Sequence, residues 1–141
     1  MLFRSCCLRT GIPGISENIH INGIIDRYLE HSRIFIFANG GEEKYYIGSA
    51  DWMPRNLDNR IEVLAPVYDK EIQADLKRIV CYGYRDTAKG RIVDGTGENR
   101  PWENRPSTLC KDFTPALAEA ETATVVFRSQ EELYRKYKNT L

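Results

Sequence analysis

A histidine and an arginine two residues apart, His31 and Arg33, open a short apolar stretch at residues 34–37. Successive side chains of a β-strand point to opposite faces, so this spacing places both side chains on the same face. An imidazole titrates near neutral pH and can take or give a proton, while a guanidinium binds phosphate in a bidentate manner. The pair therefore indicates a site where phosphate is bound and a proton can be transferred.

A second group of polar residues follows within one hairpin of the first. Its members are Ser49, Asp51, Arg55, Asn56, Asp58, Arg60 and Glu62. If residues 60–65 form a strand, side-chain alternation places Asp58, Arg60 and Glu62 on one face. Ile61 and Val63 would then lie on the opposite face, against the core. We expect the polar face to line the phosphate site, although Arg60 and Glu62 could instead form a simple ion pair without a ligand.

These motifs resemble a known superfamily. His-x-Arg at a strand start, followed by Gly-Ser-x-Asp at residues 48–51, is similar to the His-x-Lys and Gly-Ser-x-Asn signature of the phospholipase D superfamily. More narrowly, the chain resembles the C-terminal catalytic domain of the long bacterial polyphosphate kinases. The matching segments are residues 6–9, 11–19, 28–34, 39–41, 48–58, 60–63 and 127–133, with a weakly matching interval from about 96 to 126.

Two departures from the superfamily pattern narrow this interpretation. The lysine is replaced by Arg33, and the aspartate expected five residues later is Ala38. A phospholipase or nuclease function loses support without that aspartate, whereas the resemblance implies that polyphosphate kinases tolerate both changes in their second half.

The resemblance implies half of an active site. In polyphosphate kinases two phospholipase D-like halves face each other, and the covalent phosphohistidine belongs to the first half, which these 141 residues lack. The second half contributes a histidine that matches His31, acting as an acid or phosphate ligand. It also contributes an upstream arginine that binds nucleotide phosphate, for which Arg4 is the nearest candidate. Arg60 and Glu62 match positions that line the phosphate tunnel.

The implied reaction is reversible transfer of the γ-phosphate of ATP to inorganic polyphosphate, with Mg²⁺ offsetting charge. His31 would be the catalytic residue. The residues expected to bind or orient phosphate and nucleotide are Arg4, Arg33, Ser49, Asp51, Arg55, Asn56, Arg60 and Glu62. The expected partners are ATP or ADP, polyphosphate, and either the missing N-terminal polyphosphate kinase domains or a second copy of the chain. We expect a binding half-site with little activity alone.

Two alternatives stay open. In the first, two copies dimerise and bring His31 from each into a shared phosphodiesterase site, as single-motif phospholipase D-like enzymes do. Cleavage of a phosphodiester that disappears in His31→Ala would support this alternative. In the second, the chain is a non-catalytic interaction fragment, which absence of phosphate binding would favour.

Composition indicates an ordinary globular chain. With 42% hydrophobic and 28% charged residues, the sequence fits one domain over residues 1–141. Twenty basic residues balance 20 acidic ones, so no overall field attracts a polyanion, and we expect no nucleic-acid partner. The four cysteines lack zinc or Cys-x-x-Cys spacing and predict buried thiols in a reducing cytoplasm. We find neither a charged leader nor a membrane-spanning apolar run, so we expect a cytoplasmic chain with no membrane span.

Sequence patterns predict an α/β fold, specifically a phospholipase D-like mixed sheet flanked by helices. A strand at residues 2–8 suggests a fragment of a longer gene product. Next we expect a helix capped by Ser16, because its apolar residues repeat at helical spacing. The members of that stripe are Ile21, Ile24, Ile25, Tyr28 and Leu29.

The remaining elements follow from similar signals. Residues 34–37 read as a strand buried on both faces, followed by a turn at 39–41 and a pairing strand at 45–47. Trp52 and Met53 are expected as core anchors. A second helix should begin after Asp69, and residues 91–93 should form a short strand before a loop at 94–106. Residues 113–121 are assigned to a weak helix or extended arm and 122–128 to a strand. A capping box of Ser129 and Glu132 should open a last helix ending near residue 137.

Overall fold

The computed structural model describes residues 8–103, 110 and 126–138. Within these residues an antiparallel sheet pairs β1 with β5, and a second antiparallel sheet has the order β2-β3-β4. The elements in chain order are β1 Asn22–Ile24, β2 Ile34–Phe37, the 3-10 turn η1 Asn39–Gly41, β3 Lys44–Gly48, α1 Pro54–Leu57, β4 Leu64–Val67, α2 Lys70–Tyr84, β5 Gly90–Ile92 and α3 Ser129–Lys138. The α/β class predicted from the sequence is confirmed.

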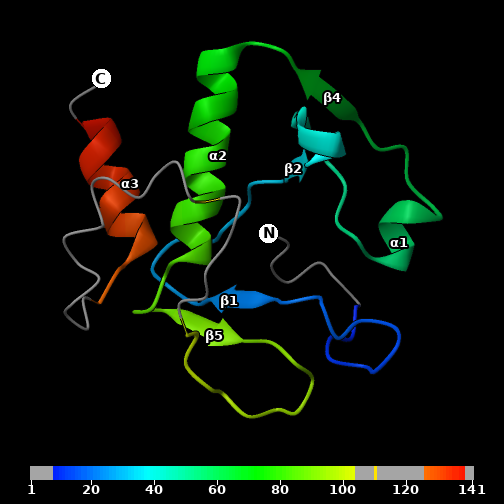
Figure 1. Ribbon diagram of the computed structural model, residues 1–141, viewed down its shortest axis with the longest axis vertical. Helices are drawn as coiled ribbons and strands as arrows, with labels where there is room; N and C mark the ends of the chain where they lie inside the picture. Colours follow the sequence, from blue (N-terminus) through cyan, green and yellow to red (C-terminus); the bar gives the residue numbers. More distant parts are fainter. Residues whose placement is uncertain (1–7, 104–109, 111–125, 139–141) are drawn as a thin grey trace.

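Helix α2 is the centre of the arrangement. It lies between the three-stranded sheet and α3, and the β1–β5 pair lies at its C-terminal end (Figure 1). As predicted, Asp69 caps the helix, because its carboxylate accepts hydrogen bonds from the backbone N–H groups of Glu71 and Ile72 at 2.9 and 3.0 Å. Further along α2, Lys77 Nζ forms an ion pair with Oε1 of Glu43, just before β3, at 3.0 Å.

The hairpin of β2 and β3 is confirmed, and β4 pairs with β3 on its other side. In this register Ile36, Tyr45 and Val67 lie side by side, and Tyr45 is the most deeply buried of the sheet residues. Strand β2 has no second partner among the described residues and Phe37 is half exposed, so the prediction that it is buried on both faces is wrong. The strand expected at 60–65 begins instead at Leu64.

The helix predicted after Ser16 does not form. Residues 22–24 are strand β1 instead, and the Ser16 hydroxyl closes a loop by donating to the Arg9 carbonyl oxygen at 2.8 Å. The physical reason lies in Asn22, a poor helix former whose buried amide donates to the Gly83 carbonyl oxygen at 2.9 Å and accepts from the Arg91 N–H at 3.1 Å. These contacts with α2 and β5 stabilise the strand, whereas the helical spacing of the apolar residues reflects only the local sequence.

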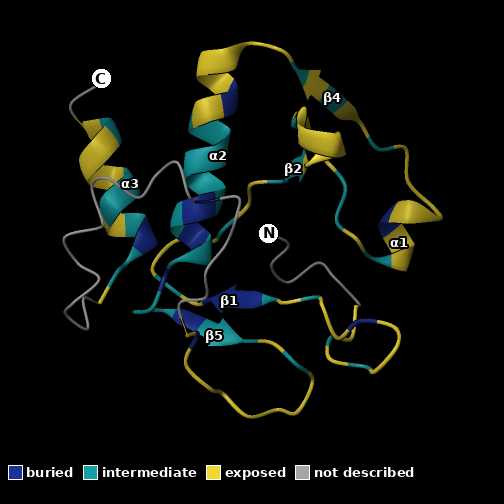
Figure 2. Ribbon diagram, in the orientation of Figure 1, coloured by how far each residue is buried: buried dark blue, intermediate teal, exposed yellow. Residues whose placement is uncertain are grey.

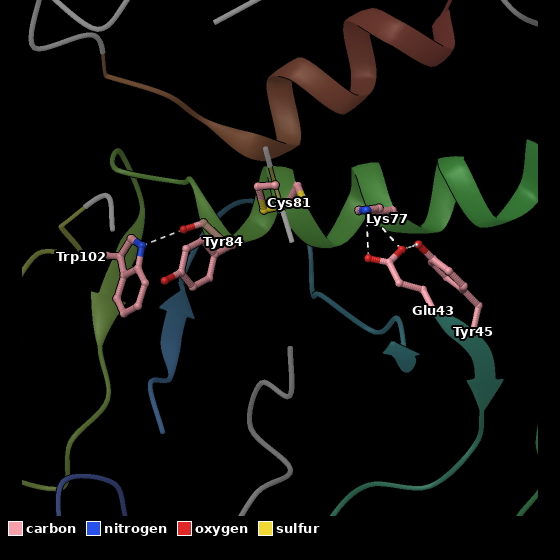
Figure 3. The surroundings of a disulfide bond; sticks show 7 residues. Glu43, Tyr45, Lys77, Cys81, Tyr84 and Trp102 are labelled. Atoms are coloured by element: carbon pink, nitrogen blue, oxygen red, sulfur yellow. Dashed lines mark hydrogen bonds and ion pairs between the residues drawn. A yellow bond between two sulfur atoms is a disulfide. The ribbon is translucent and has the colours of Figure 1, made fainter. Parts of the chain in front are cut away.

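The buried residues gather where the C-terminal end of α2 meets β1, β5 and the start of α3, whereas α1 and β4 are largely exposed (Figure 2). Trp102 donates from its indole Nε1 to the Tyr84 carbonyl oxygen at 2.7 Å, and the two rings meet edge to face (Figure 3). A disulfide joins Cys81, in the middle of this region, to Cys110. The prediction that all four cysteines are free thiols is therefore wrong for these two.

Several smaller expectations also change. Trp52 is 45% exposed and stacks on Phe35 with ring centroids 6.0 Å apart, so it is a surface residue rather than a core anchor. Helix α3 is confirmed, but Ser129 does not act as its expected capping residue, because its hydroxyl donates to Asp86. Residues 126–128 are not in a strand. The expectations for residues 2–7, 104–106, 113–121 and 122–125 lie outside the described residues.

Candidate functional site

His31 and Arg33 lie together just before β2, in a segment that is not a strand, so the strand alternation expected from their spacing does not apply. Asp51 joins them from the segment after β3. The Arg33 guanidinium donates to Asp51 Oδ1 from Nε at 2.8 Å and from Nη2 at 2.7 Å. Its Nη1 donates to the His31 carbonyl oxygen at 3.0 Å and lies 3.1 Å from His31 Nδ1. Arg33 is therefore largely occupied by protein groups, and its main structural role is to hold His31 and Asp51 in place.

The Arg33 guanidinium also lies against the imidazole. Its Nη1 is 3.1 Å from His31 Nδ1 and 3.5 Å from His31 Nε2, so it is close to both ring nitrogens. The His31 residue is exposed, whereas the Arg33 and Asp51 side chains are 17% and 15% exposed. The outward group of this cluster is thus the imidazole, with the more buried Arg33–Asp51 ion pair behind it.

Ser49, Asn56 and Glu62 form a second cluster. Both carboxylate oxygens of Glu62 accept hydrogen bonds: one from the Ser49 hydroxyl and the other from Asn56 Nδ2 at 2.9 Å. The Ser49 hydroxyl also accepts from the Val63 N–H at 3.0 Å, which joins the end of β3 to the start of β4. The bonds from Ser49 and then Asn56 lower the pKa of Glu62, so this carboxylate stays ionised.

The two clusters adjoin one another. The Gly48 N–H donates to the Arg33 carbonyl oxygen at 3.0 Å, so the strand end that carries Arg33 lies against the one that carries Ser49. The charge of Asp51 also acts on the Glu62 carboxylate, together with the opposing charge of Arg60. Six of the predicted site residues are therefore brought to one end of the three-stranded sheet, where β2 and β4 begin and β3 ends.

The arginines of this region differ in what they contact. Arg55, on α1, and Arg60 are exposed and have no hydrogen bond or ion pair within the described part of the chain. Their guanidinium groups are available to an anion in a way that Arg33 is not. Arg4 lies outside the described residues.

Asp58, Arg60 and Glu62 do not share one face of a strand, so that prediction is wrong. These residues precede β4, and Asp58 is the C-cap of α1. Ile61 is fully exposed and Val63 is 64% exposed, so neither contacts the core as expected. Glu62 reaches Ser49 and Asn56 through a loop conformation rather than by strand alternation.

Within residues 8–103, 110 and 126–138, no group of three or more His, Cys, Asp or Glu side chains is placed to hold a metal ion. The same part of the chain contains no helix that is both long and apolar enough to cross a membrane.

A sequence model of the family described as polyphosphate kinase C-terminal domain 2 matches residues 1–111. The chain belongs to this family. The match covers β1 to β5 and both polar clusters, so the resemblance inferred from the His31 and Gly48 motifs is confirmed.

Individual relatives agree with the family assignment. The chain is 45% identical over 120 residues to a polyphosphate kinase of Thermosynechococcus vestitus, covering 84% of this chain and 15% of that protein. It is 44% identical over 121 residues to a polyphosphate kinase of Pseudomonas aeruginosa, covering 79% of this chain and 18% of the relative. The chain therefore spans less than a fifth of the length of these relatives.

A solved structure shows the same fold. The crystal structure of polyphosphate kinase from Porphyromonas gingivalis superposes with a TM-score of 0.74 at 36% sequence identity. The superposition covers 96% of this chain and 18% of the crystallised chain. The phospholipase D-like α/β architecture expected from the motifs is thus the architecture of a polyphosphate kinase segment.

Sequence reasoning missed the contacts that support the backbone before His31. Asp26, Arg128 and Gln130 make these contacts, although they lie about a hundred positions apart in sequence. The available signal was that residues 127–133 belong to the stretches that resemble the family, but no chemistry was assigned to them. No sequence feature marked Asp26 as functional, because it lies outside the apolar stripe of the helix predicted there.

Proposed function

We propose that this chain is the part of a polyphosphate kinase that binds phosphate groups during transfer of the ATP γ-phosphate to inorganic polyphosphate. The observation that carries the proposal is the pair of adjoining clusters, His31–Arg33–Asp51 and Ser49–Asn56–Glu62, in a chain of this family. His31 offers its exposed imidazole to a phosphate oxygen, as an acid or a ligand. Arg55 and Arg60 supply exposed cations.

The other residues have supporting roles in this proposal. Arg33 and Asp51 orient His31, while Ser49 and Asn56 hold Glu62 ionised beside Arg60. An anionic Glu62 repels phosphate, so in this proposal its charge acts on the nearby Arg60 guanidinium without forming an ion pair with it. The remaining half of the active site would come from the portion of polyphosphate kinase that this chain lacks, or from a second copy of the chain.

In this proposal Mg²⁺ is bound to the nucleotide and not to the chain alone. Because the described residues form no cage of carboxylates, the protein groups present do not fit a metal ion held by the chain alone. Mg²⁺ commonly binds through substrate phosphates with few protein ligands. We therefore assign no step to it and expect it to arrive bound to ATP.

Titration calorimetry of the chain with tripolyphosphate, and with ATP in the presence of Mg²⁺, tests the proposal. Arg60→Gln should weaken tripolyphosphate binding roughly 10- to 100-fold, since a hydrogen bond to a charged group contributes about 1.5–3 kcal/mol. Arg135→Gln, an exposed arginine on α3, is the matched control and should bind like the unaltered chain. Absence of binding, or equal affinities for the two variants, contradicts the proposal.

Transfer of labelled γ-phosphate from ATP separates a half-site from a complete site. We expect little polyphosphate product from the chain alone, because the nucleophilic half is missing. Turnover that His31→Ala abolishes would show that the chain assembles a complete site, and the half-site part of the proposal would then be wrong.

A further inference from the structure

The backbone that leads into His31 is not held by regular structure. Residues 25–30 connect β1 to His31 and form neither helix nor strand. On one side this segment borders a hollow of about 670 Å³ between residues 23–30 and 91–99. Tyr28 and Leu29 are 65% and 62% exposed, so packing alone does not fix the segment. Its backbone groups need partners from elsewhere.

Gln130 provides them from the first turn of α3. Its Nε2 donates to the Tyr28 carbonyl oxygen at 2.7 Å, and its Oε1 accepts from the Tyr28 N–H at 3.0 Å. One side-chain amide thus satisfies both backbone groups of a residue 102 positions away, in the manner of a single strand pairing. The same Nε2 lies 2.9 Å from Glu30 Oε1, directly before His31.

Arg128 holds the same segment at its other end. Its guanidinium binds Asp26 in a bidentate manner, from Nε at 2.8 Å and from Nη2 at 2.6 Å. The Asp26 side chain is 2% exposed, so the pair is shielded from water on the carboxylate side. Charged pairs with this geometry restrict both partners more strongly than surface ion pairs do.

Helix α3 is itself anchored to the buried centre of the molecule. Both the N–H and the hydroxyl of Ser129 donate to Asp86 Oδ2, at 2.8 and 2.6 Å, and Asp86 is fully buried just after α2. The N–H groups of Thr87 and Ala88 donate to the Phe127 carbonyl oxygen. A continuous series of hydrogen bonds therefore runs from the end of α2 through residues 127–130 to the segment before His31.

We propose that Gln130 and Arg128 are positioning residues for His31. Their hydrogen bonds go to Asp26, Tyr28 and Glu30, so they fix the backbone from Asp26 to Glu30 and with it the direction in which His31 leaves it. Arg33 then holds the imidazole from the other side. The proposal rests on the proposed function only where phosphate affinity is the readout, because the position of the His31 ring can be measured without any ligand.

The test is Gln130→Met, which keeps the length of the side chain, removes its hydrogen bonds and adds no charge. The readout is the ¹⁵N signals of the imidazoles, which report the surroundings of both His31 ring nitrogens, each of which lies near Arg33 Nη1. We expect the His31 signals to shift and tripolyphosphate affinity to fall roughly tenfold, because small misplacements of a binding group have large effects. His20, the other histidine of the chain, should keep its signals.

Gln73→Met is the matched control. Gln73 also holds a backbone carbonyl through its amide, donating to the Val67 oxygen at 2.7 Å, but it lies at the start of α2. It should lower thermal stability without moving the His31 signals. If Gln130→Met does not fold, Arg128→Lys replaces it, since it keeps the charge and loses the bidentate geometry.

Unchanged His31 signals in the Gln130 or Arg128 variant, or an equal shift in Gln73→Met, overturn the proposal. A chain that does not bind tripolyphosphate refutes the proposed function instead, and the ring signals still decide whether Gln130 positions His31.

Discussion

At the scale of single residues, the candidate site depends on side chains that hold other side chains. Arg33 is an example. Its place in the sequence motif indicates phosphate binding, but its guanidinium is already bonded to Asp51 and His31. The two residues do meet, but not through the strand alternation that the His-x-Arg spacing suggested, because both precede β2. The spacing could not show that Arg33 faces inward, since that depends on Asp51, 18 positions later.

The Asp26–Arg128 pair predicts a pH dependence of stability. The hydrogen bonds from Arg128 lower the pKa of Asp26 below that of an unfolded chain, which is about 4. A lowered folded-state pKa stabilises the protein above the unfolded value, and this contribution disappears as pH falls through the folded value. We therefore expect the free energy of unfolding to decrease between about pH 5 and pH 2.

Urea unfolding at a series of pH values measures this effect. Asp26→Asn should be less stable than the unaltered chain at pH 6, and the difference should narrow towards pH 2. A constant difference across this range would show that Asp26 does not carry the dependence.

At the scale of elements, the small β1–β5 sheet depends on a close approach at Gly90. A Cβ atom at this position would lie 2.1 Å from the Asp86 carbonyl oxygen, 2.7 Å from Asn22 Oδ1 and 2.8 Å from Trp102 Cβ. The first of these is a backbone atom and cannot move away like the end of a flexible side chain. Only glycine fits where β5 passes the turn after α2.

Gly90→Ala should lower the free energy of unfolding by roughly 1 to 3 kcal/mol, the usual cost of overpacking. Hydrogen exchange should show lost protection at β1 and β5. Gly97→Ala is the comparison, since its Cβ meets nothing within 4 Å and only its left-handed backbone, at φ +79°, is strained. Retained protection of β1 and β5 in Gly90→Ala would refute this account.

Elements with strong local signals were predictable, and elements defined by distant contacts were not. Helix α2 carries its own Asp69 cap, and the β2–β3 hairpin carries its Asn-Gly-Gly turn, so both could be predicted from sequence. Strand β1 has a helical apolar spacing, and only the Asn22 contacts with Gly83 and Arg91 make it a strand. The start of β4 was misplaced because residues 60–63 alternate between polar and apolar, as in a strand, although they form a loop.

At the scale of the whole molecule, the candidate site and the buried centre are separate. Buried residues concentrate around the C-terminal end of α2 (Figure 2). The polar clusters lie where β2 and β4 begin and β3 ends, and of their members Asn56 is buried. Among the residues that the structure describes, the buried set is small and contains polar groups such as Asn22 and Asp86. Covalent and hydrogen-bonded links across this centre therefore have a large share in holding the fold.

The Cys81–Cys110 disulfide should contribute strongly to stability. Its cysteines are 29 positions apart, and closing a loop of that size restricts the unfolded chain by about 3 to 4 kcal/mol. The reduced protein and the variant with both cysteines changed to alanine should unfold at lower urea concentration than the oxidised protein. The reduced protein controls for the loss of buried sulfur volume. Identical midpoints for all three would contradict the expectation.

The most direct test of the central claim is to map phosphate binding onto the chain by NMR. Tripolyphosphate should be titrated into the ¹⁵N-labelled protein while backbone and imidazole signals are followed. The account predicts shifts at His31, at residues 48–51 and at residues 55–62, which carry the two polar clusters and the exposed arginines. Absence of shifts, or shifts confined to the basic end of α3 at residues 135–138, would contradict the claim that these clusters form a phosphate site.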